Sequence, residues 1–113
     1  MILTINEKDI EFKFGLKFLK RVDQIVGGDL AKFGMGLDQL LPALAMYTPQ
    51  AVETILLASQ ASDKKLSLNE VDEFIENSDF EDLVEMITKE MEESNIIRPK
   101  MKKSKELMGQ ATK

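Results

Sequence analysis

The chain has 113 residues, of which 43% are hydrophobic and 31% are charged, and it contains neither cysteine nor histidine. This length allows one domain with a modest core, and the missing cysteine excludes disulfides and thiol chemistry. The missing histidine removes the usual general base near neutral pH and the commonest metal ligand. We therefore expect a protein that is not an enzyme and that has no cofactor, metal site or catalytic residue.

The balance of charge changes along the chain. Residues 1–68 hold eight basic and eight acidic side chains, residues 69–95 hold one and eleven, and residues 96–113 hold six and one. The net charge of −5 argues against nucleic acid as a partner, because attraction to phosphates needs Lys and Arg clustered on a folded face. No stretch approaches the roughly 18 apolar residues of a membrane span, and no secretory leader is visible. We expect a cytoplasmic protein that binds neither nucleic acid nor membrane.

Residues 2–14 predict a β-hairpin with a turn at residues 6–9. Apolar and polar positions alternate on both sides of this turn, and the apolar ones are Leu3, Ile5, Ile10, Phe12 and Phe14. Because two strands alone are marginal in water, we expect the apolar face to lie on helices.

A helix is predicted after Gly15, which ends the alternation. Apolar residues then recur at helical spacing, at Leu16, Leu19, Val22, Ile25 and Val26, and the polar residues between them, including Asp23, are expected to face outward. Gly27-Gly28 is the expected left-handed cap of this helix. Residues 29–36 predict a loop.

The most apolar stretch, residues 37–61, predicts a hairpin of two helices at the centre of the fold. In its first helix, Leu37, Leu40, Leu41, Leu44 and Ala45 share one face. Pro42 removes one backbone donor, so this helix either begins near Asp38 with Pro42 close to its first turn or is bent at Pro42. We favour the first arrangement.

The second helix of this hairpin is predicted to begin at Pro49 with Thr48 as its N-cap, and its inward residues are Val52, Ile55 and Leu56. Leaving four leucines of the hairpin in water would forfeit roughly 6–12 kcal/mol, at about 1.5–3 kcal/mol each. The rest of the chain, a second copy or a client must therefore cover this surface. We expect a client or a second copy to contact Leu40, Leu41, Leu44, Met46 and Tyr47.

Two more helices are predicted after a polar linker at residues 61–66. Ser67-Leu68-Asn69-Glu70 and Ser78-Asp79-Phe80-Glu81 each match a capping box at a helix N-terminus. The acidic residues are expected to be solvated, and the second helix is expected to end before Pro99. The inward residues are Leu68, Val71, Phe74 and Ile75 in the first helix and Phe80, Leu83, Val84, Ile87 and Met91 in the second.

These patterns together predict a mainly α protein with a short N-terminal β-hairpin, in which about five helices pack around the central apolar hairpin. The predicted domain covers residues 1–95, and residues 96–113 are expected to form a basic tail that is flexible or loosely helical. Residues 63–74 resemble a calcium loop only superficially, because Leu68 replaces the required Gly and Phe74 replaces the closing Glu.

Five parts of the sequence are similar to the tail assembly chaperones of long-tailed, siphovirus-type bacteriophages and prophages of Gram-positive bacteria. The resemblance covers nearly the whole chain in the same order, and the Phe-Gly-Met-Gly-Leu run is its most telling part. The five parts are Phe12-Lys13-Phe14-Gly15-Leu16-Lys17-Phe18, Phe33-Gly34-Met35-Gly36-Leu37, Pro42, Val71-Asp72-Glu73-Phe74-Ile75 and Glu92-Glu93-Ser94-Asn95.

The resemblance implies a non-enzymatic protein that binds the tape measure protein in the cytoplasm of the host bacterium, keeps this long hydrophobic helical protein soluble and helps recruit tail tube subunits. It also implies a short form and a longer, frameshifted form that contacts the tail tube protein, both absent from the mature virion. A minor structural tail or connector protein of the virion and a small cytoplasmic regulatory adaptor are alternatives from other classes.

Overall fold

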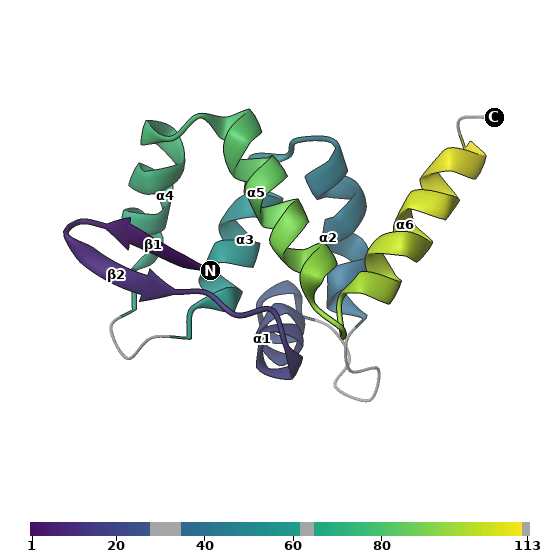
Figure 1. Ribbon diagram of the computed structural model, residues 1–113, viewed down its shortest axis with the longest axis horizontal. Helices are drawn as coiled ribbons and strands as arrows, with labels where there is room; N and C mark the ends of the chain where they lie inside the picture. Colours follow the sequence, from purple (N-terminus) through teal and green to yellow (C-terminus); the bar gives the residue numbers. More distant parts are fainter. Residues whose placement is uncertain (28–34, 62–64, 112–113) are drawn as a thin grey trace.

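Six helices follow a two-stranded antiparallel hairpin in the computed structural model, which describes residues 1–27, 35–61 and 65–111 (Figure 1). The predicted mainly α fold with an N-terminal β-hairpin is confirmed, with six helices where about five were expected. Most of the predicted loop at 29–36 and half of the predicted linker lie outside the described residues. The elements are β1 (Ile2–Ile5), β2 (Lys8–Glu11), α1 (Leu16–Val26), α2 (Gly36–Ala45), α3 (Pro49–Ser59), α4 (Leu68–Asn77), α5 (Phe80–Glu93) and α6 (Arg98–Ala111).

The β-hairpin has a tighter turn than its sequence predicted. Leu3 lies opposite Ile10 and Ile5 lies opposite Lys8, which leaves only Asn6 and Glu7 in the turn. Both turn residues have positive φ angles, 53° and 64°. Two-residue turns of this kind match the twist of the flanking strands. The expected turn over residues 6–9 is therefore wrong by two residues.

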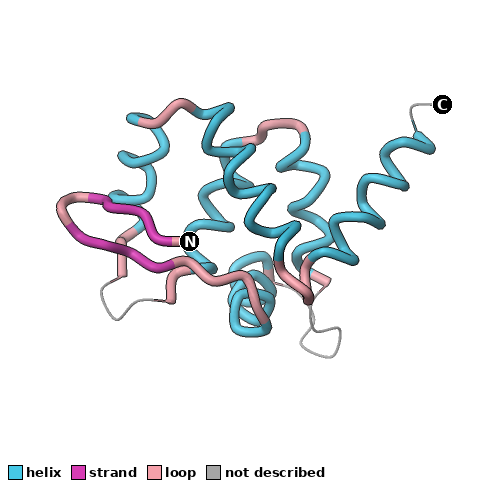
Figure 2. The backbone as a smooth tube through the Cα atoms, viewed as in Figure 1, coloured by secondary structure: helices cyan, strands magenta, loops and turns pink. Residues whose placement is uncertain are grey.

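The hairpin is fastened to the end of α3. Beyond β2, Phe12 pairs with Gln60 in an antiparallel bridge. The Lys13 N–H donates to the Ser59 carbonyl at 2.8 Å, and the Ala61 N–H donates to the Glu11 carbonyl at 2.8 Å. Figure 2 shows the two strands at one end of the helical body. As predicted, the apolar face of the hairpin lies on helices, and Ile5, Ile10, Phe12 and Phe14 are buried.

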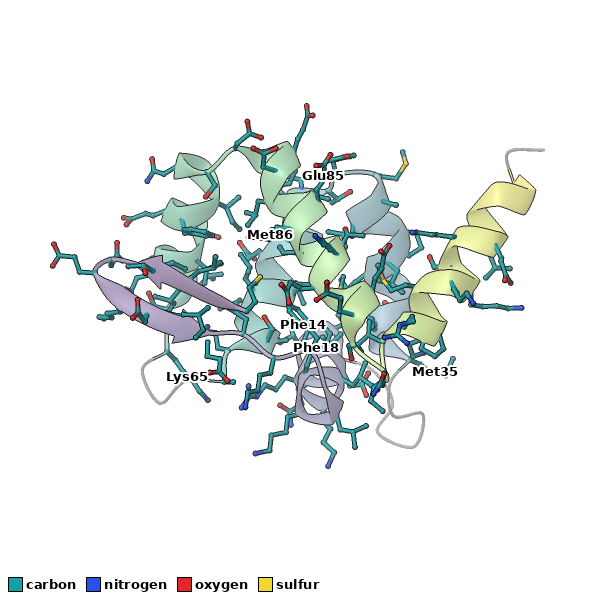
Figure 3. All side chains as sticks on the ribbon, in the orientation of Figure 1. Phe14, Phe18, Met35, Lys65, Glu85 and Met86 are labelled. Carbon is teal, nitrogen blue, oxygen red and sulfur yellow. The ribbon has the colours of Figure 1, made fainter. Side chains whose placement is uncertain are left out.

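Helix α1 has the predicted bounds, and its residues Leu19 and Val22 are buried and Val26 is half-buried, as predicted. Gly27 ends it in the left-handed region, with a φ of 73°. Leu16 and Ile25, expected inward, are exposed, whereas Phe18 is buried. The Phe18 ring meets the Phe14 ring edge to face with 5.2 Å between centroids (Figure 3). This contact packs α1 against the segment that follows the hairpin.

The prediction that Asp23 faces outward is wrong, since only 2% of this residue is exposed. Its Oδ1 accepts a hydrogen bond from the Gly36 N–H at 2.8 Å. The first N–H groups of a helix have no partner within it, and a carboxylate at this end also suits the helix dipole. The contact requires glycine, because a Cβ on Gly36 would lie 2.6 Å from this Oδ1 and 2.8 Å from Val26 Cγ2.

The apolar hairpin of α2 and α3 lies at the centre of the fold. Pro42 is inside α2 rather than in its first turn, so that expectation is wrong, because the helix begins at Gly36, where Asp23 caps it. The predicted start of α3 is confirmed, with Thr48 as N-cap and Pro49 as the first helical residue. The predicted inward residues of α3, Val52, Ile55 and Leu56, are fully buried.

Gln60 organises the connection from α3 to α4. Its side-chain amide donates to the Leu66 carbonyl at 3.3 Å, and its side-chain oxygen accepts from the Leu66 N–H. Leu66 is buried, so the expected polar linker is wrong at its last residue. Arg21 of α1 donates to the Gln60 and Ala58 carbonyls. These bonds satisfy buried backbone groups that no helix or strand would otherwise pair.

Helix α4 begins with the predicted capping box. The Glu70 N–H donates to Ser67 Oγ at 3.2 Å, and Glu70 Oε1 accepts from the Ser67 N–H at 3.1 Å. Val71 is buried as expected, and Phe74 and Ile75 are half-buried. Leu68 was also expected inward, but 49% of this residue is exposed.

Helix α5 starts one residue later than its predicted capping box implied. Asp79, not Ser78, is the N-cap, and its side chain accepts from the Asp82 N–H at 3.1 Å. Ser78 Oγ instead donates to the Phe74 carbonyl at 2.6 Å, which closes the end of α4. The predicted stripe of α5 is confirmed at Leu83, Val84, Ile87 and Met91, which are buried, while Phe80 is half-buried.

The chain from Arg98 to Ala111 forms α6, the additional helix. Ile97 and Met101 are buried in the core. Ser94 Oγ donates to the Phe14 carbonyl at 2.6 Å and accepts from the Ile97 N–H at 3.3 Å. The first turns of α6 are therefore packed on the body, and Figure 1 shows the helix leaning away from α2 toward its C-terminal end. Flexibility of residues 96–113 and a domain boundary at residue 95 stay predictions.

Candidate partner-binding surface

The structure divides the five residues expected to contact a partner into two groups. Leu40, Leu41 and Leu44 are buried in the core against the other helices, so the chain itself covers them. Met46 is 73% exposed and Tyr47 is 44% exposed. The part of the predicted surface that is open to a partner is thus reduced to these two residues. No contact of any of the five with a partner is tested, and that role stays a prediction.

Met46 and Tyr47 form the turn between α2 and α3. Tyr47 has a φ of 57°, and its N–H donates to the Leu44 carbonyl at 3.0 Å. In this left-handed turn both side chains lie outside the buried face of the α2–α3 hairpin. Tyr47 also borders a shallow groove of about 290 Å³ between the end of α2 and α5, where Val84 and Glu85 lie on the opposite side. An apolar patch with a charged border results at this tip of the molecule.

A larger groove, which we call the α2–α6 groove, lies between α2 and α6. It has a volume of about 590 Å³. The sequence did not predict this groove, because residues 96–113 were expected to form a basic tail and not to pack beside the apolar hairpin. A single signal was available: Leu107 is a large apolar residue within a strongly basic segment. The groove is lined by Asp38, Pro42, Pro99, Lys100, Lys103, Ser104 and Leu107.

Opposite charges gather at the two ends of the molecule. Helix α4 carries four acidic side chains and no basic one, whereas α6 carries five basic side chains and one acidic one. Figure 1 shows α4 and α6 at opposite ends of the long axis. As predicted, the acidic residues of α4 and α5 are exposed or half-exposed. Charge separation on this scale orients a charged partner on approach.

Two carboxyl groups, Glu70 on α4 and Glu53 on the neighbouring α3, have shifted pKa values. Hydrogen bonds from the Ser67 backbone and the Asn6 side chain, together with nearby Lys8, lower the pKa of Glu70. A hydrogen bond with Asp72, partial burial and repulsion from the same carboxylate raise the pKa of Glu53. These groups connect α4 to the β-hairpin and to α3, so both shifts belong to packing of the fold.

Three kinds of feature are absent from the described residues. Within 1–27, 35–61 and 65–111, no group of three His, Cys, Asp or Glu side chains could hold a metal ion. In the same ranges, every buried side-chain nitrogen or oxygen has a hydrogen-bond partner. None of the described helices is long and apolar enough to cross a membrane. What the surface does offer is apolar area beside clustered charge.

The small helical body thus exposes an apolar turn and a groove beside clustered charges, and surfaces of this kind are typical of proteins that bind other proteins. A family model described as phage tail assembly chaperone protein, TAC, matches residues 2–105. The chain therefore belongs to the phage tail assembly chaperone family, as its resemblance predicted. No curated protein and no solved structure matches it. A chaperone acts by binding, and the family implies binding of tail proteins in general.

Proposed function

We propose that this protein binds the tape measure protein during tail assembly, keeps it soluble and helps to bring tail tube subunits to it. The observation that carries this proposal is the family match over residues 2–105. The tape measure protein is long, helical and hydrophobic, and such a client needs a partner with exposed apolar surface that is itself well solvated. Met46 and Tyr47 provide such surface beside the charged α5.

The remaining parts of the proposal follow from the same role. The protein works without enzymatic activity in the cytoplasm of a Gram-positive host, and it leaves before the virion is complete. The tail tube protein is contacted by a longer product extended by ribosomal frameshifting. Mass spectrometry of purified particles tests the departure, since a stoichiometric amount of this chain in the virion would instead favour a structural tail protein.

Coexpression with the tape measure protein of the same phage tests the client. We expect the tape measure protein to move from the pellet to the soluble fraction and to coelute with this chain on size exclusion. The proposal is wrong if the client is equally soluble without the chain and no complex elutes.

A pair of variants tests the exposed turn within this assay. Met46→Glu combined with Tyr47→Asn places polar groups on the turn, and asparagine tolerates the left-handed conformation of residue 47. Ile25→Glu is the matched control, because Ile25 is a similarly exposed apolar residue on α1. We expect the double variant to lose most of the client from the soluble fraction and the control to retain it. Equal loss in both would remove the turn from the binding surface.

A further inference from the structure

The shape of the α2–α6 groove suits a helix. Its narrow end is fixed where Lys100 Nζ meets Asp38 Oδ1 at 2.8 Å. From there α6 leans away from α2 (Figure 1), and the groove runs along α6 from Pro99 to Leu107. At 1.5 Å per residue this is about 12 Å, or roughly two helical turns. A partner helix would therefore present apolar side chains three and four residues apart.

Three of the groove's lining residues, Pro42, Pro99 and Leu107, are apolar, and the other four are polar or charged. Pro42 and Pro99 are both exposed, and Leu107 is 56% exposed. Met101, by contrast, is buried and holds the first half of α6 on the body. The groove thus has a fixed inner end and an open outer end that leaves the Leu107 side chain in water. Covering this side chain gives a partner helix a favourable apolar contact.

The positive charge at the edge of the groove favours a negatively charged partner. Lys100 and Lys105 are already paired with carboxylates, at 2.8 Å and 2.6 Å. Lys103 lies at the edge of the groove with its side chain 72% exposed, and its contact with Glu106 is a loose one of 4.0 Å along the same helix. A cationic edge beside an apolar wall complements a helix whose apolar stripe is bordered by carboxylates.

We infer that the α2–α6 groove binds an amphipathic helical segment of the client whose apolar stripe is bordered by Asp and Glu. This inference rests on the proposed chaperone function and identifies where and what kind of client segment binds. A second copy of this chain fits less well, although its α4 is acidic. Among the large apolar side chains of α4, only Leu68 is exposed, while Val71, Phe74 and Ile75 are at least half-buried against its own body.

Two designed helical peptides test the groove on the whole chain. Both carry leucines at positions i, i+3, i+4 and i+7, and the positions beside this stripe are glutamate in one peptide and lysine in the other. In fluorescence anisotropy we expect the glutamate peptide to bind at least about tenfold more tightly. We also expect its affinity to fall at about 1 M ionic strength, where charges are screened beyond about 3 Å. Equal or reversed affinities would overturn the charge selection.

Variants of exposed residues locate the binding. Leu107→Asp should weaken binding of the glutamate peptide at least tenfold, and Lys103→Glu should reverse the preference between the two peptides. Leu68→Asp is the matched control, since Leu68 is 49% exposed and lies on α4 at the other end of the molecule. Circular dichroism melting confirms that each variant is folded. If Leu68→Asp weakens binding as much as Leu107→Asp, the groove is not the site.

Two further measurements separate the possible failures. If the wild-type chain does not keep the tape measure protein soluble in coexpression, the proposed function fails. If the wild type and Leu107→Asp keep it equally soluble, the groove inference fails and the proposed function stands. Light scattering after size exclusion tests whether a second copy of the chain occupies the groove. If the wild type self-associates, Leu107→Asp abolishes this association and neither peptide binds, the groove belongs to another copy and the inference is wrong.

Discussion

The close contact between α1 and α2 predicts a large loss of stability in Gly36→Ala. The added Cβ would lie 2.6 Å from Asp23 Oδ1, 2.8 Å from Val26 Cγ2 and 3.2 Å from Asp23 Cα. Because the last atom is backbone, the helices must separate or the carboxylate must leave the Gly36 N–H. Overpacking costs about 1–3 kcal/mol and the lost charged hydrogen bond about 1.5–3 kcal/mol, while alanine returns at most about 1 kcal/mol of helix propensity.

We therefore expect Gly36→Ala to lower the free energy of unfolding by about 2–4 kcal/mol, measured by urea denaturation followed by circular dichroism. At about 4–8 °C per kcal/mol for a chain of this size, the melting temperature should fall by at least about 8 °C. Gly15→Ala is the matched control, because no described atom lies within 4 Å of its added Cβ. A Gly36→Ala protein as stable as the wild type would refute the reasoning.

Three further predictions concern single side chains. Gln60→Ala leaves the buried N–H and carbonyl of Leu66 without their partner. The free energy of unfolding, measured in urea, should therefore fall by about 2–4 kcal/mol. A loss below about 1 kcal/mol would mean that water replaces the amide. Asp79→Ala should lower the stability measured in thermal melts by about 1 kcal/mol, which is more than Ser78→Ala, because Asp79 caps α5. A larger loss in Ser78→Ala would mean that Ser78 is the cap. The pKa of Glu53 is raised beside Asp72, so the folded protein binds this proton more tightly than the unfolded chain and loses stability as pH rises through the raised pKa. Glu53→Gln should thus be more stable than the wild type at about pH 7, by up to about 1 kcal/mol, and this difference should shrink toward about pH 4. A difference that grows on acidification would contradict the prediction.

Local signals in the sequence were enough for much of the fold. Gly27 marks the end of α1 because only a left-handed residue closes the helix there. Pro49 marks the start of α3, because it suits the first position of a helix and has no N–H that needs a partner. Ser67 and Glu70 mark the start of α4, because they form a capping box. Each of these features involves only a few consecutive residues, so a short stretch of sequence is enough to predict it.

Contacts between distant segments could not be predicted in this way. Asp23 resembles an outward polar residue until Gly36 brings an unpaired N–H beside it. Leu16 and Leu68 continue apolar stripes, yet both are exposed because neighbouring elements do not reach them. The α2–α6 groove likewise depends on where α6 packs, which Ile97 and Met101 determine. In each case the partner in space, rather than the periodicity, decides what is buried.

The bond between Ser94 Oγ and the Phe14 carbonyl has a consequence for synthesis on the ribosome. It joins residues 80 positions apart, and the next core residues, Ile97 and Met101, come still later. The hairpin and α1 are therefore translated first, but their last contacts form only after α5 and the start of α6 have emerged. Until then the nascent chain exposes Phe14 and its apolar neighbours, and exposed apolar surface of this kind favours aggregation. A chain stalled before Ile97 should consequently be a substrate for the host's own folding machinery.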